Sequence, residues 1–291
     1  VATDANQIEP RVMGWLTGQR DLHDAFANGR DVYSEFAARV FGCDVHKPSP
    51  CESNAGRLNA LRQVGKKAIL GLGYGMGVER FMGSLQEDKL CLSLFEEGVL
   101  DERVCARLVH GFRDKYSHIH NAWKACDRAF RDALNGSPTY IGLLSFRKRS
   151  SDVCLKLPSG REMVFADARL APASPEPRTY LDANGHRQEF TPTDGEISFG
   201  NNRRLYGGAI VEYVVSGTAR DILVHTIIQV EKAGFQVISH CHDEIICEVE
   251  ADRAEECREA IEEAWQNVPT WAAGLVLESE SSIGTNYAEI K

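Results

Sequence analysis

The sequence predicts an α+β fold, with antiparallel strands near both ends of the chain and a helical middle. Apolar, β-branched runs over 235–239 and 245–249 flank a polar corner, a pattern typical of a hairpin of buried strands. Residues 85–135 have the spacing of amphipathic helices, and strand patterns follow after 136–138, Gly-Ser-Pro. These three observations predict a mixed architecture.

The individual elements follow from periodicity and from the turn residues between them. A short strand leads to Asp4, and Pro10 fits the first turn of the helix that follows. The segment 158–160, Pro-Ser-Gly, is typical of a hairpin turn. The predicted segments are a helix over 11–18, helices over 21–41 with a break at Gly29, a loop over 43–58, a helix over 58–77, a hairpin over 153–166, an exposed insertion over 171–200, a long helix over 205–232 and a last helix over 254–266.

Composition narrows the class of protein. The 291 residues are 43% hydrophobic and 26% charged, and no apolar run approaches the roughly 18 residues of a membrane span. Nine scattered cysteines without metal-ligand spacing predict reduced thiols in the cytoplasm, with neither disulfides nor zinc. The net charge of −9 argues against a protein that binds nucleic acid by general attraction to its phosphates. An enzyme that acts on nucleic acid and gathers its cations on one surface is still compatible with this charge. The chain opens at Val1, so we expect a fragment or a processed piece.

Acidic residues stand at the ends of two predicted strands. Asp4 ends the first strand, where a backbone carbonyl can help it to hold a metal ion. The polar corner of the 235–249 hairpin consists of His242, Asp243 and Glu244. Such carboxylates belong where water or a cation reaches them, because a strand interior leaves them unpaired. Taken alone, the corner is explained equally well as an ordinary acidic turn.

The stretch over 58–77 carries cations and an aromatic ring at regular spacing. Four residues recur at every fourth position and so share one slowly winding helix face: Arg62, Lys66, Leu70 and Tyr74. Two cations and a ring suit a triphosphate and a base, and glycines at 71, 73, 75 and 77 would let the backbone approach a flat ligand. The alternative is a solvated basic face before a glycine-rich helix end. The residue order is not that of a phosphate-binding P-loop.

In this order, the three motifs resemble those of the family A DNA polymerases, of the kind that bacteriophages encode. Residues 4–11, Asp-Ala-Asn-Gln-Ile-Glu-Pro-Arg, match the first motif of that family, D-Y-S-Q-I-E-L-R. Residues 62–75 match the second, R-x3-K-x3-F-G-x2-Y-G, and 242–244, His-Asp-Glu, are the third. Residues 206–208 and 212–223 are similar to the phage form of the helix before the third motif. The resemblance runs from the first residue to about Lys291.

The resemblance implies roles for the motif residues. Catalytic roles fall on Asp4, Asp243, Glu244 and Lys66. Two divalent ions, Mg²⁺ with Mn²⁺ as the alternative, would be held by Asp4, the carbonyl of Ala5 and Asp243. The incoming deoxynucleoside triphosphate would contact Gln7, Ile8, Glu9, Arg62, Lys66, Leu70 and Tyr74. The primer–template would contact His242, Tyr74 and Gly75.

Several of these positions concern the sugar and the duplex. Glu9 and Tyr74 would crowd the 2′ position and so select deoxyribose. Leu70 replaces the usual aromatic residue beside the incoming sugar, which bears on discrimination and on rate. Tyr213 and Ser216 stand where related phage sequences tend to carry Asn and Gln, which implies weaker minor-groove contacts.

The resemblance also implies a polymerase palm, 1–14 and 146–291, around inserted helical fingers, 15–145. The thumb and any 3′–5′ exonuclease domain would lie in an upstream portion outside this chain. The expected function is template-directed DNA synthesis in viral replication, in the host cytoplasm and without a membrane. Its partners would be primer–template DNA, deoxynucleoside triphosphates and that upstream portion.

Two alternatives stay open. One is a single-subunit RNA polymerase, which shares this palm but whose first motif lacks the Gln-Ile-Glu run, so that Glu9 discriminates between the two. The other is a non-catalytic half of a split polymerase, which would need an N-terminal partner.

Overall fold

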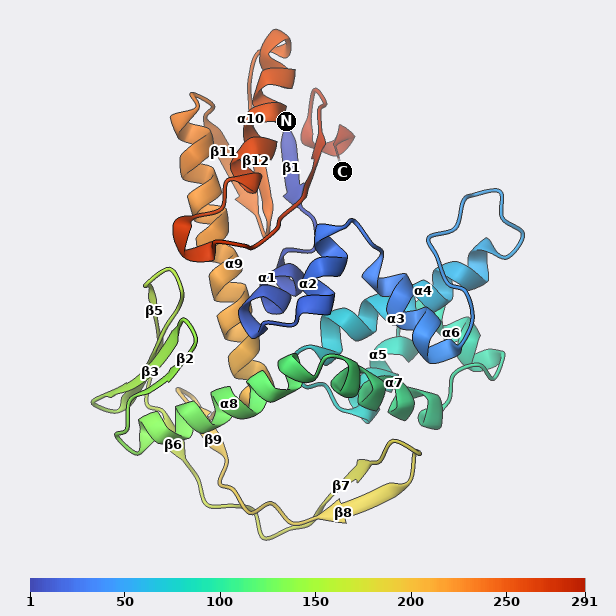
Figure 1. The fold of residues 1–291 in the computed structure, drawn as a ribbon, viewed down its shortest axis with the longest axis vertical. Coiled ribbons are helices and arrows are strands. Elements are labelled where there is room, and N and C mark those ends of the chain that lie inside the picture. The colour runs from blue at the N-terminus through green and yellow to red at the C-terminus, as the bar shows by residue number, and fades with distance from the viewer. Residues whose placement is uncertain (291) are drawn as a thin grey trace.

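The computed structural model describes residues 1–290 and confirms a mixed fold of helices and antiparallel strands. Figure 1 shows one sheet at the top of the molecule, where both chain ends lie, with the long helix α9 (Gly207–Lys232) running down from it. Shorter helices form the body beside α9, and a second sheet lies near its lower end. Lys291, the last residue of the predicted palm range, lies outside the described residues.

Helices dominate the first half of the chain, and strands make up much of the second half. The helices are α1 (Ile8–Thr17), α2 (Arg20–Ala27), α3 (Val32–Phe41), α4 (Ala55–Leu72), α5 (Val78–Gln86), α6 (Lys89–Glu96), α7 (Glu102–Lys115), α8 (Ser117–Leu134), α9 and α10 (Ala254–Gln266). Short 3₁₀ turns are η1 (Ala251–Arg253), η2 (Thr270–Ala272) and η3 (Tyr287–Glu289). The strands are β1 (Ala2–Ala5), β2 (Thr139–Ile141), β3 (Leu144–Arg149), β4 (Asp152–Lys156), β5 (Glu162–Phe165), β6 (Arg169–Leu170), β7 (Arg178–Leu181), β8 (Arg187–Phe190), β9 (Ile197–Phe199), β10 (Arg203–Leu205), β11 (Val237–Cys241), β12 (Glu244–Cys247) and β13 (Ser279–Ser282).

The terminal sheet joins the two ends of the chain. Its strand order is β11-β12-β1-β13, so β1 lies between two strands that come more than 200 residues later. Both pairings of β1 are antiparallel, and Asp4 lies opposite Glu244 on one side and Glu280 on the other. The register therefore places the end of β1 beside the turn of the β11–β12 hairpin.

Helix α9 is the central helix of the fold. It is buried on more than one face because α1, α8 and α10 all pack against it. Trp123 and Phe130 on α8 lie in the core, as their spacing predicts. Within residues 1–290, no helix combines the length and the apolar character that a membrane crossing requires.

The boundaries of three predicted segments need correction. The loop predicted over 43–58 ends at residue 54, because α4 begins at Ala55. That helix ends at Leu72 and not at residue 77, since Gly75 has a φ of +82°, which a right-handed helix does not contain. The helix predicted from 205 begins at Gly207, because 203–205 form β10.

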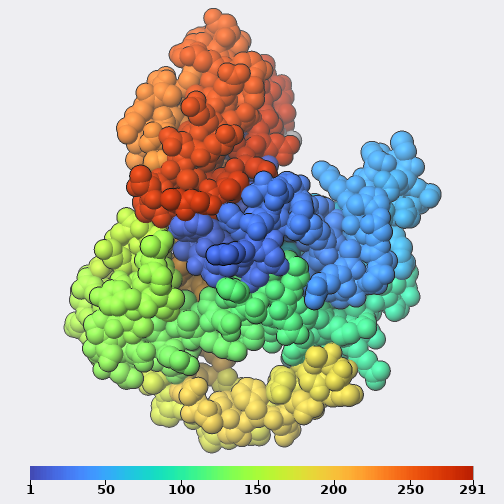
Figure 2. Space-filling view, viewed as in Figure 1, coloured from blue at the N-terminus to red at the C-terminus, as the bar shows by residue number. Residues whose placement is uncertain are grey.

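The insertion over 171–200 is largely exposed, as predicted, but it contains paired strands. Arg178 pairs with Phe190 and Leu181 with Arg187 in the β7–β8 hairpin. The carboxylate of Asp182 accepts hydrogen bonds of 2.9 Å from two backbone N–H groups of the turn, which stabilises it. Figure 2 shows this hairpin in yellow as an arm along the outside of the molecule. The polar composition of this segment therefore gave no indication of the hairpin, whose turn is stabilised by Asp182.

Candidate active site

The fold brings Asp4 and Asp243 to the same end of the terminal sheet. The backbone N–H of Ala5 donates to the carbonyl oxygen of Asp243 at 3.1 Å. Asp4 is exposed and Asp243 is only partly buried, so water or a cation can reach both carboxylates. Two acids from opposite ends of the chain are thus neighbours, as the motifs predict.

The β11–β12 turn consists of His242 and Asp243. Cys241 pairs with Glu244, which leaves these two residues as the loop of the hairpin. His242 has a φ of 55°, and a positive φ at the first loop position is the backbone that type II′ turns require. That conformation is uncommon for a residue with a side chain, and the exposed His242 adopts it at the sheet edge.

The structure corrects the expectation that Glu244 lies with His242 and Asp243 in an accessible polar corner. Glu244 is the first residue of β12 and only 5% exposed, so it does not share the solvent-accessible turn with Asp243. The hydroxyl of Tyr287 donates a 2.7 Å hydrogen bond to its Oε2. The C-terminal segment therefore supplies a polar partner for an acid that the register places inside the sheet.

Arg11 is a structural residue of this site that sequence reasoning missed. Its side chain is 2% exposed and donates to the carbonyl oxygens of Asn6, at 2.9 Å, and Val276, at 3.3 Å, and to the carboxylate of Glu278. Burial lowers the pKa of the Arg11 guanidinium, although the charge and hydrogen bond of Glu278 oppose that shift. Arg11 thereby fixes the backbone beside Asp4 and Ala5. The available signal was a cation between the apolar residues Pro10 and Val12.

Glu9 and Tyr74, predicted to act on the sugar, are in direct contact. The hydroxyl of Tyr74 donates to Glu9 Oε2 at 2.9 Å, and the hydroxyl of Ser216 donates to Glu9 Oε1 at 2.7 Å. Burial, and then the neighbouring Glu9 carboxylate, raise the pKa of Tyr74 well above its ordinary value. Tyr74 is therefore a neutral donor that joins the end of α4 to α1.

A pocket of about 450 Å³ connects these groups to the carboxylate turn. The residues that line it include Ile8, Glu9, Ser216, Arg220, His242 and Asp243. Gln7 stands just before α1 with a φ of 53°, and this left-handed residue turns the chain from β1 into the helix. The first and third motifs therefore share one cavity.

On α4 the predicted triphosphate residues differ in their availability. Lys66 is exposed and Leu70 is 38% exposed, so neither belongs to the core. Arg62 is held by Asp31 through two hydrogen bonds, Nε to Oδ2 at 2.7 Å and Nη2 to Oδ1 at 3.3 Å. Burial opposes the ionisation of Asp31, but the hydrogen bonds from Arg62 and Ser34 outweigh it and keep its pKa below the usual range.

Gly73 and Gly75 after α4 lie close to protein groups, whereas a Cβ on Gly77 would meet nothing within 4 Å, so the service of these glycines to a flat ligand stays a prediction. A Cβ on Gly73 would lie 2.8 Å from the Met13 side chain, and the Gly73 carbonyl accepts a 2.7 Å hydrogen bond from the Trp123 indole. A Cβ on Gly208 would lie 2.1 Å from the carbonyl oxygen of Tyr74. Gly75, predicted to face the primer–template, packs near the Tyr206 ring. Small residues here let α8 and α9 approach the Tyr74 segment closely.

Tyr213, predicted to stand at a minor-groove position, packs into an aromatic cluster. Its ring lies 5.4 Å from that of Phe165 and 6.1 Å from that of Phe199, both edge-on. The ring therefore serves the contact between α9 and the strands.

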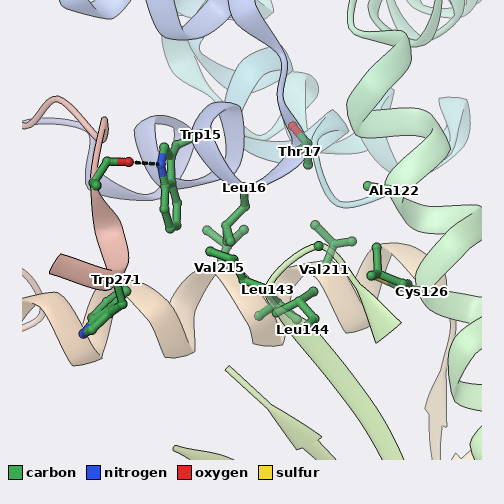
Figure 3. A pocket seen from close by; sticks show the side chains of 14 residues that line it. Trp15, Leu16, Thr17, Ala122, Cys126, Leu143, Leu144, Val211, Val215 and Trp271 are labelled. Atoms are coloured by element: carbon green, nitrogen blue, oxygen red, sulfur yellow. Dashed lines mark hydrogen bonds between the residues drawn. The ribbon is translucent and has the colours of Figure 1, made fainter. Parts of the chain in front are cut away.

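A separate apolar pocket of about 430 Å³ lies between α1, α8, α9 and the β2–β3 turn (Figure 3). Trp15 and Val215 help to line it, so it uses a different face of α9 from Ser216. Of the described residues in its lining, Cys126 alone is titratable, and burial raises the pKa of that thiol to about 12. The thiol stays protonated near neutral pH, and the pocket offers no charge for catalysis.

Sequence comparison agrees with the motifs. Residues 1–135 match the model of DNA polymerase family A. The DNA polymerase of Bacillus phage SP02 is 30% identical over 98% of this chain and 40% of its own length. Thermostable DNA polymerases I of Thermus filiformis and Thermus thermophilus are each 23% identical over the whole chain and 27% of their own lengths.

Structural comparison defines the fold class. The POL domain of Pol1 from M. smegmatis, in complex with DNA primer-template and dNTP, aligns over 96% of this chain and 38% of its own, with a TM-score of 0.56 and 18% identity. The fold is therefore that of a polymerase domain, with an antiparallel palm sheet and a helical subdomain. Together with the sequence matches, it confirms the resemblance to family A DNA polymerases, a bacteriophage member among them. The chain spans about two fifths of the phage relative and about a quarter of the Thermus relatives.

Proposed function

We propose that this chain is the palm and fingers portion of a template-directed DNA polymerase, which adds deoxynucleotides to a primer 3′-end in viral DNA replication. The observation that carries the proposal is the contact between Ala5 and Asp243, which brings Asp4 and Asp243 together beside the Glu9 pocket. The Tyr74–Glu9 hydrogen bond joins the segment after α4 to one residue of the pocket lining. These contacts support the proposal that the acid pair, the Glu9–Tyr74 pair and the basic face of α4 act on one substrate.

The donor set fits Mg²⁺, with Mn²⁺ as the alternative. Asp4, the Ala5 carbonyl and Asp243 would hold it, because hard divalent ions prefer carboxylate and carbonyl oxygens. Among residues 1–290, no group of three or more His, Cys, Asp or Glu side chains is placed to hold a metal ion. Water and substrate phosphates would therefore supply further ligands, as is usual for Mg²⁺. When bound, two such ions stabilise the attacking and the leaving oxygens of an in-line displacement.

The chain's own residues would bind and orient the nucleotide. Lys66 projects from an exposed position of α4 and would neutralise charge on the triphosphate. Arg62 would assist only after it exchanges Asp31 for phosphate, a change that preserves a charged, bidentate hydrogen-bonding partner. His242 would lie at the primer end, and Glu244 would support the metal site at second rank, from inside the sheet. Leu70 would lie beside the sugar.

The division into palm, 1–14 and 146–291, and fingers, 15–145, is part of the proposal. Residue 14 lies within α1 and residue 145 within β3, so the mechanical boundaries would fall at the ends of these elements. The partners would be primer–template DNA, deoxynucleoside triphosphates and an upstream portion with the thumb. All nine cysteines are free thiols, which suits the reducing host cytoplasm in which we place the reaction.

DNA synthesis is favoured over RNA synthesis by Glu9, whose carboxylate is built into the site by two hydroxyl donors. The relatives named above are DNA polymerases. The alternative of a non-catalytic half of a split polymerase stays open. It predicts a chain that contributes binding surface but whose acid pair is dispensable.

The test is primer extension by the chain supplied with its upstream portion, comparing Asp243→Asn with the wild type. Asparagine preserves the shape of the turn but removes the charge, so we expect a loss of about a thousandfold in kcat, because metal stabilisation of the transition state amounts to several kcal/mol. Asp252→Asn is the matched control, since Asp252 is an exposed aspartate in η1. Near-normal turnover by Asp243→Asn would exclude the two-metal assignment and favour the non-catalytic half.

A further inference from the structure

We infer that Ser216 is a positioning residue for Glu9 and that its hydroxyl sets how strictly the site excludes a ribose 2′-hydroxyl. The inference rests on the proposed function, because it concerns the sugar specificity of the same site. It starts from a contact that no motif indicates: a serine on α9 donates to a carboxylate on α1.

The Glu9 carboxylate is held at both of its oxygens. Ser216 Oγ donates to Oε1 at 2.7 Å, and Tyr74 Oη donates to Oε2 at 2.9 Å. A carboxylate with one hydroxyl donor can rotate about its terminal torsion, which has a broad, shallow profile. With a donor at each oxygen, the plane of the group is defined by two elements, α9 and the end of α4. A defined plane is what a steric barrier at one position of a sugar requires.

The backbone at Ser216 is itself anchored by the β4–β5 hairpin. A Cβ on Gly217 would lie 2.9 Å from Leu157 Cδ1, so the helix lies directly against this hairpin. Arg161 donates to the Gly217 carbonyl oxygen at 2.8 Å and to Asp221 Oδ1 at 2.5 Å. The carbonyl and carboxylate that it binds lie one and five residues beyond Ser216 on α9. Ser216 thus presents its hydroxyl from a helix segment with little freedom to move.

Ser216 also lines the pocket where the sugar of the nucleotide is proposed to lie. Glu9, Ser216 and Asp243 share its wall, so the hydroxyl acts within the site. When the Ser216 hydroxyl is removed, the Tyr74 hydroxyl is the one of these two donors that still binds Glu9. The carboxylate then swings away from the 2′ position more readily, and the barrier to a ribonucleotide falls. Glu9 retains its charge and its place on α1, so the barrier is reduced and not abolished.

The test compares Ser216→Ala, Ser216→Thr and wild type in primer extension, with the chain supplied with its upstream portion. The readout is the ratio of kcat/KM for a ribonucleotide to kcat/KM for the matching deoxyribonucleotide. We expect Ser216→Ala to raise this ratio about three- to tenfold, which corresponds to about 0.7–1.4 kcal/mol. Ser216→Thr keeps a hydroxyl and should restore the wild-type ratio. Ser93→Ala is the matched control, because it removes a helical serine hydroxyl that donates to Leu90 on α6.

The possible outcomes separate the inference from the proposed function. A wild-type ratio in Ser216→Ala, with a raised KM for primer–template, would mean that Ser216 contacts DNA directly and would overturn the inference. The same rise in Ser216→Thr as in Ser216→Ala would also overturn it, since the hydroxyl would then be irrelevant. Wild-type protein that incorporates no deoxynucleotide would instead refute the proposed function. Equal melting temperatures for the variants show that each one folds.

Discussion

The contact between Gly208 and Tyr74 offers the sharpest test of how the fold supports the site. An alanine at 208 would place its Cβ 2.1 Å from the Tyr74 carbonyl oxygen and 2.9 Å from the Tyr206 ring. Because side-chain Cβ atoms essentially never approach another heavy atom within 3.0 Å, the Tyr74 backbone has to move by roughly 1 Å. The obstacle is backbone, so no rotamer change relieves it.

Two opposing effects determine the magnitude. Gly208 lies in the first turn of α9, where alanine is favoured over glycine by about 0.5–1 kcal/mol at most. Overpacking a buried contact costs typically about 1–3 kcal/mol. The steric effect wins, and we expect Gly208→Ala to lower the free energy of unfolding by about 1–2 kcal/mol. A change of 1 kcal/mol shifts Tm by roughly 2–4 °C in chains of this size class.

The shift should also reach the site. The Tyr74 hydroxyl lies 2.9 Å from Glu9, and a displacement of roughly 1 Å takes it beyond hydrogen-bonding distance. We therefore expect lower sugar selectivity in the extension assay as well as a lower Tm by circular dichroism. Gly111→Ala on α7 is the control, since its Cβ would meet nothing within 4 Å and should stabilise by about 0.5–1 kcal/mol. A Gly208→Ala protein as stable as Gly111→Ala, with unchanged selectivity, would refute the steric argument.

Two further predictions concern pH and DNA. Burial, followed by the charges of Lys124 and Arg113, lowers the pKa of His120, which lies against Trp123. The unfolded chain therefore binds more protons than the folded one below about pH 6.5, so stability falls as the pH drops through that value. His120→Asn should reduce the loss of Tm between pH 7.5 and 5.5, and an identical loss in the variant would assign the effect to other groups. Residues 1–291 alone should bind primer–template weakly, because the net charge is −9 and the thumb contacts are expected upstream. A titration at two salt concentrations, with and without the upstream portion, checks this; tight binding by the chain alone would contradict it.

Local elements can be predicted from neighbours in the sequence, whereas the pairing of Asp4 with Asp243 was implied by the resemblance to the polymerase motifs. The apolar, β-branched runs around 237–247 are enough to predict a hairpin, but the prediction that both strands are buried is wrong for β11, which is largely exposed, while β12 is mostly buried. The fourfold spacing of Arg62, Lys66 and Leu70 is enough to predict a helix face. Asp4 and Asp243 stand at strand ends, which the chain order alone reveals. These are properties of neighbours in sequence.

What the sequence could not supply depends on contacts between distant segments. In the sequence, Arg11 cannot be distinguished from any other helical cation. In the fold, the C-terminal segment supplies it with the Val276 carbonyl oxygen and the Glu278 carboxylate, and Asn6 supplies a second carbonyl oxygen. From the sequence, Glu244 is predicted to be part of an acidic turn. The register of the sheet instead places it in β12, inside the sheet and next to Tyr287. In the sequence, Gly73 suggests a surface for a ligand. In the fold, the Met13 side chain fills the space beside it.

Ser216 is the clearest case of a decision made by tertiary structure. The resemblance assigns Ser216 to a minor-groove position, and nothing in its local sequence indicates a contact with Glu9. Its hydroxyl contacts Glu9 only because α1 and α9 pack together and because Gly217 lets the β4–β5 hairpin lie close to the helix. A hydrogen bond requires atoms within about 3.5 Å, and a one-dimensional pattern holds no such distance for residues 207 positions apart.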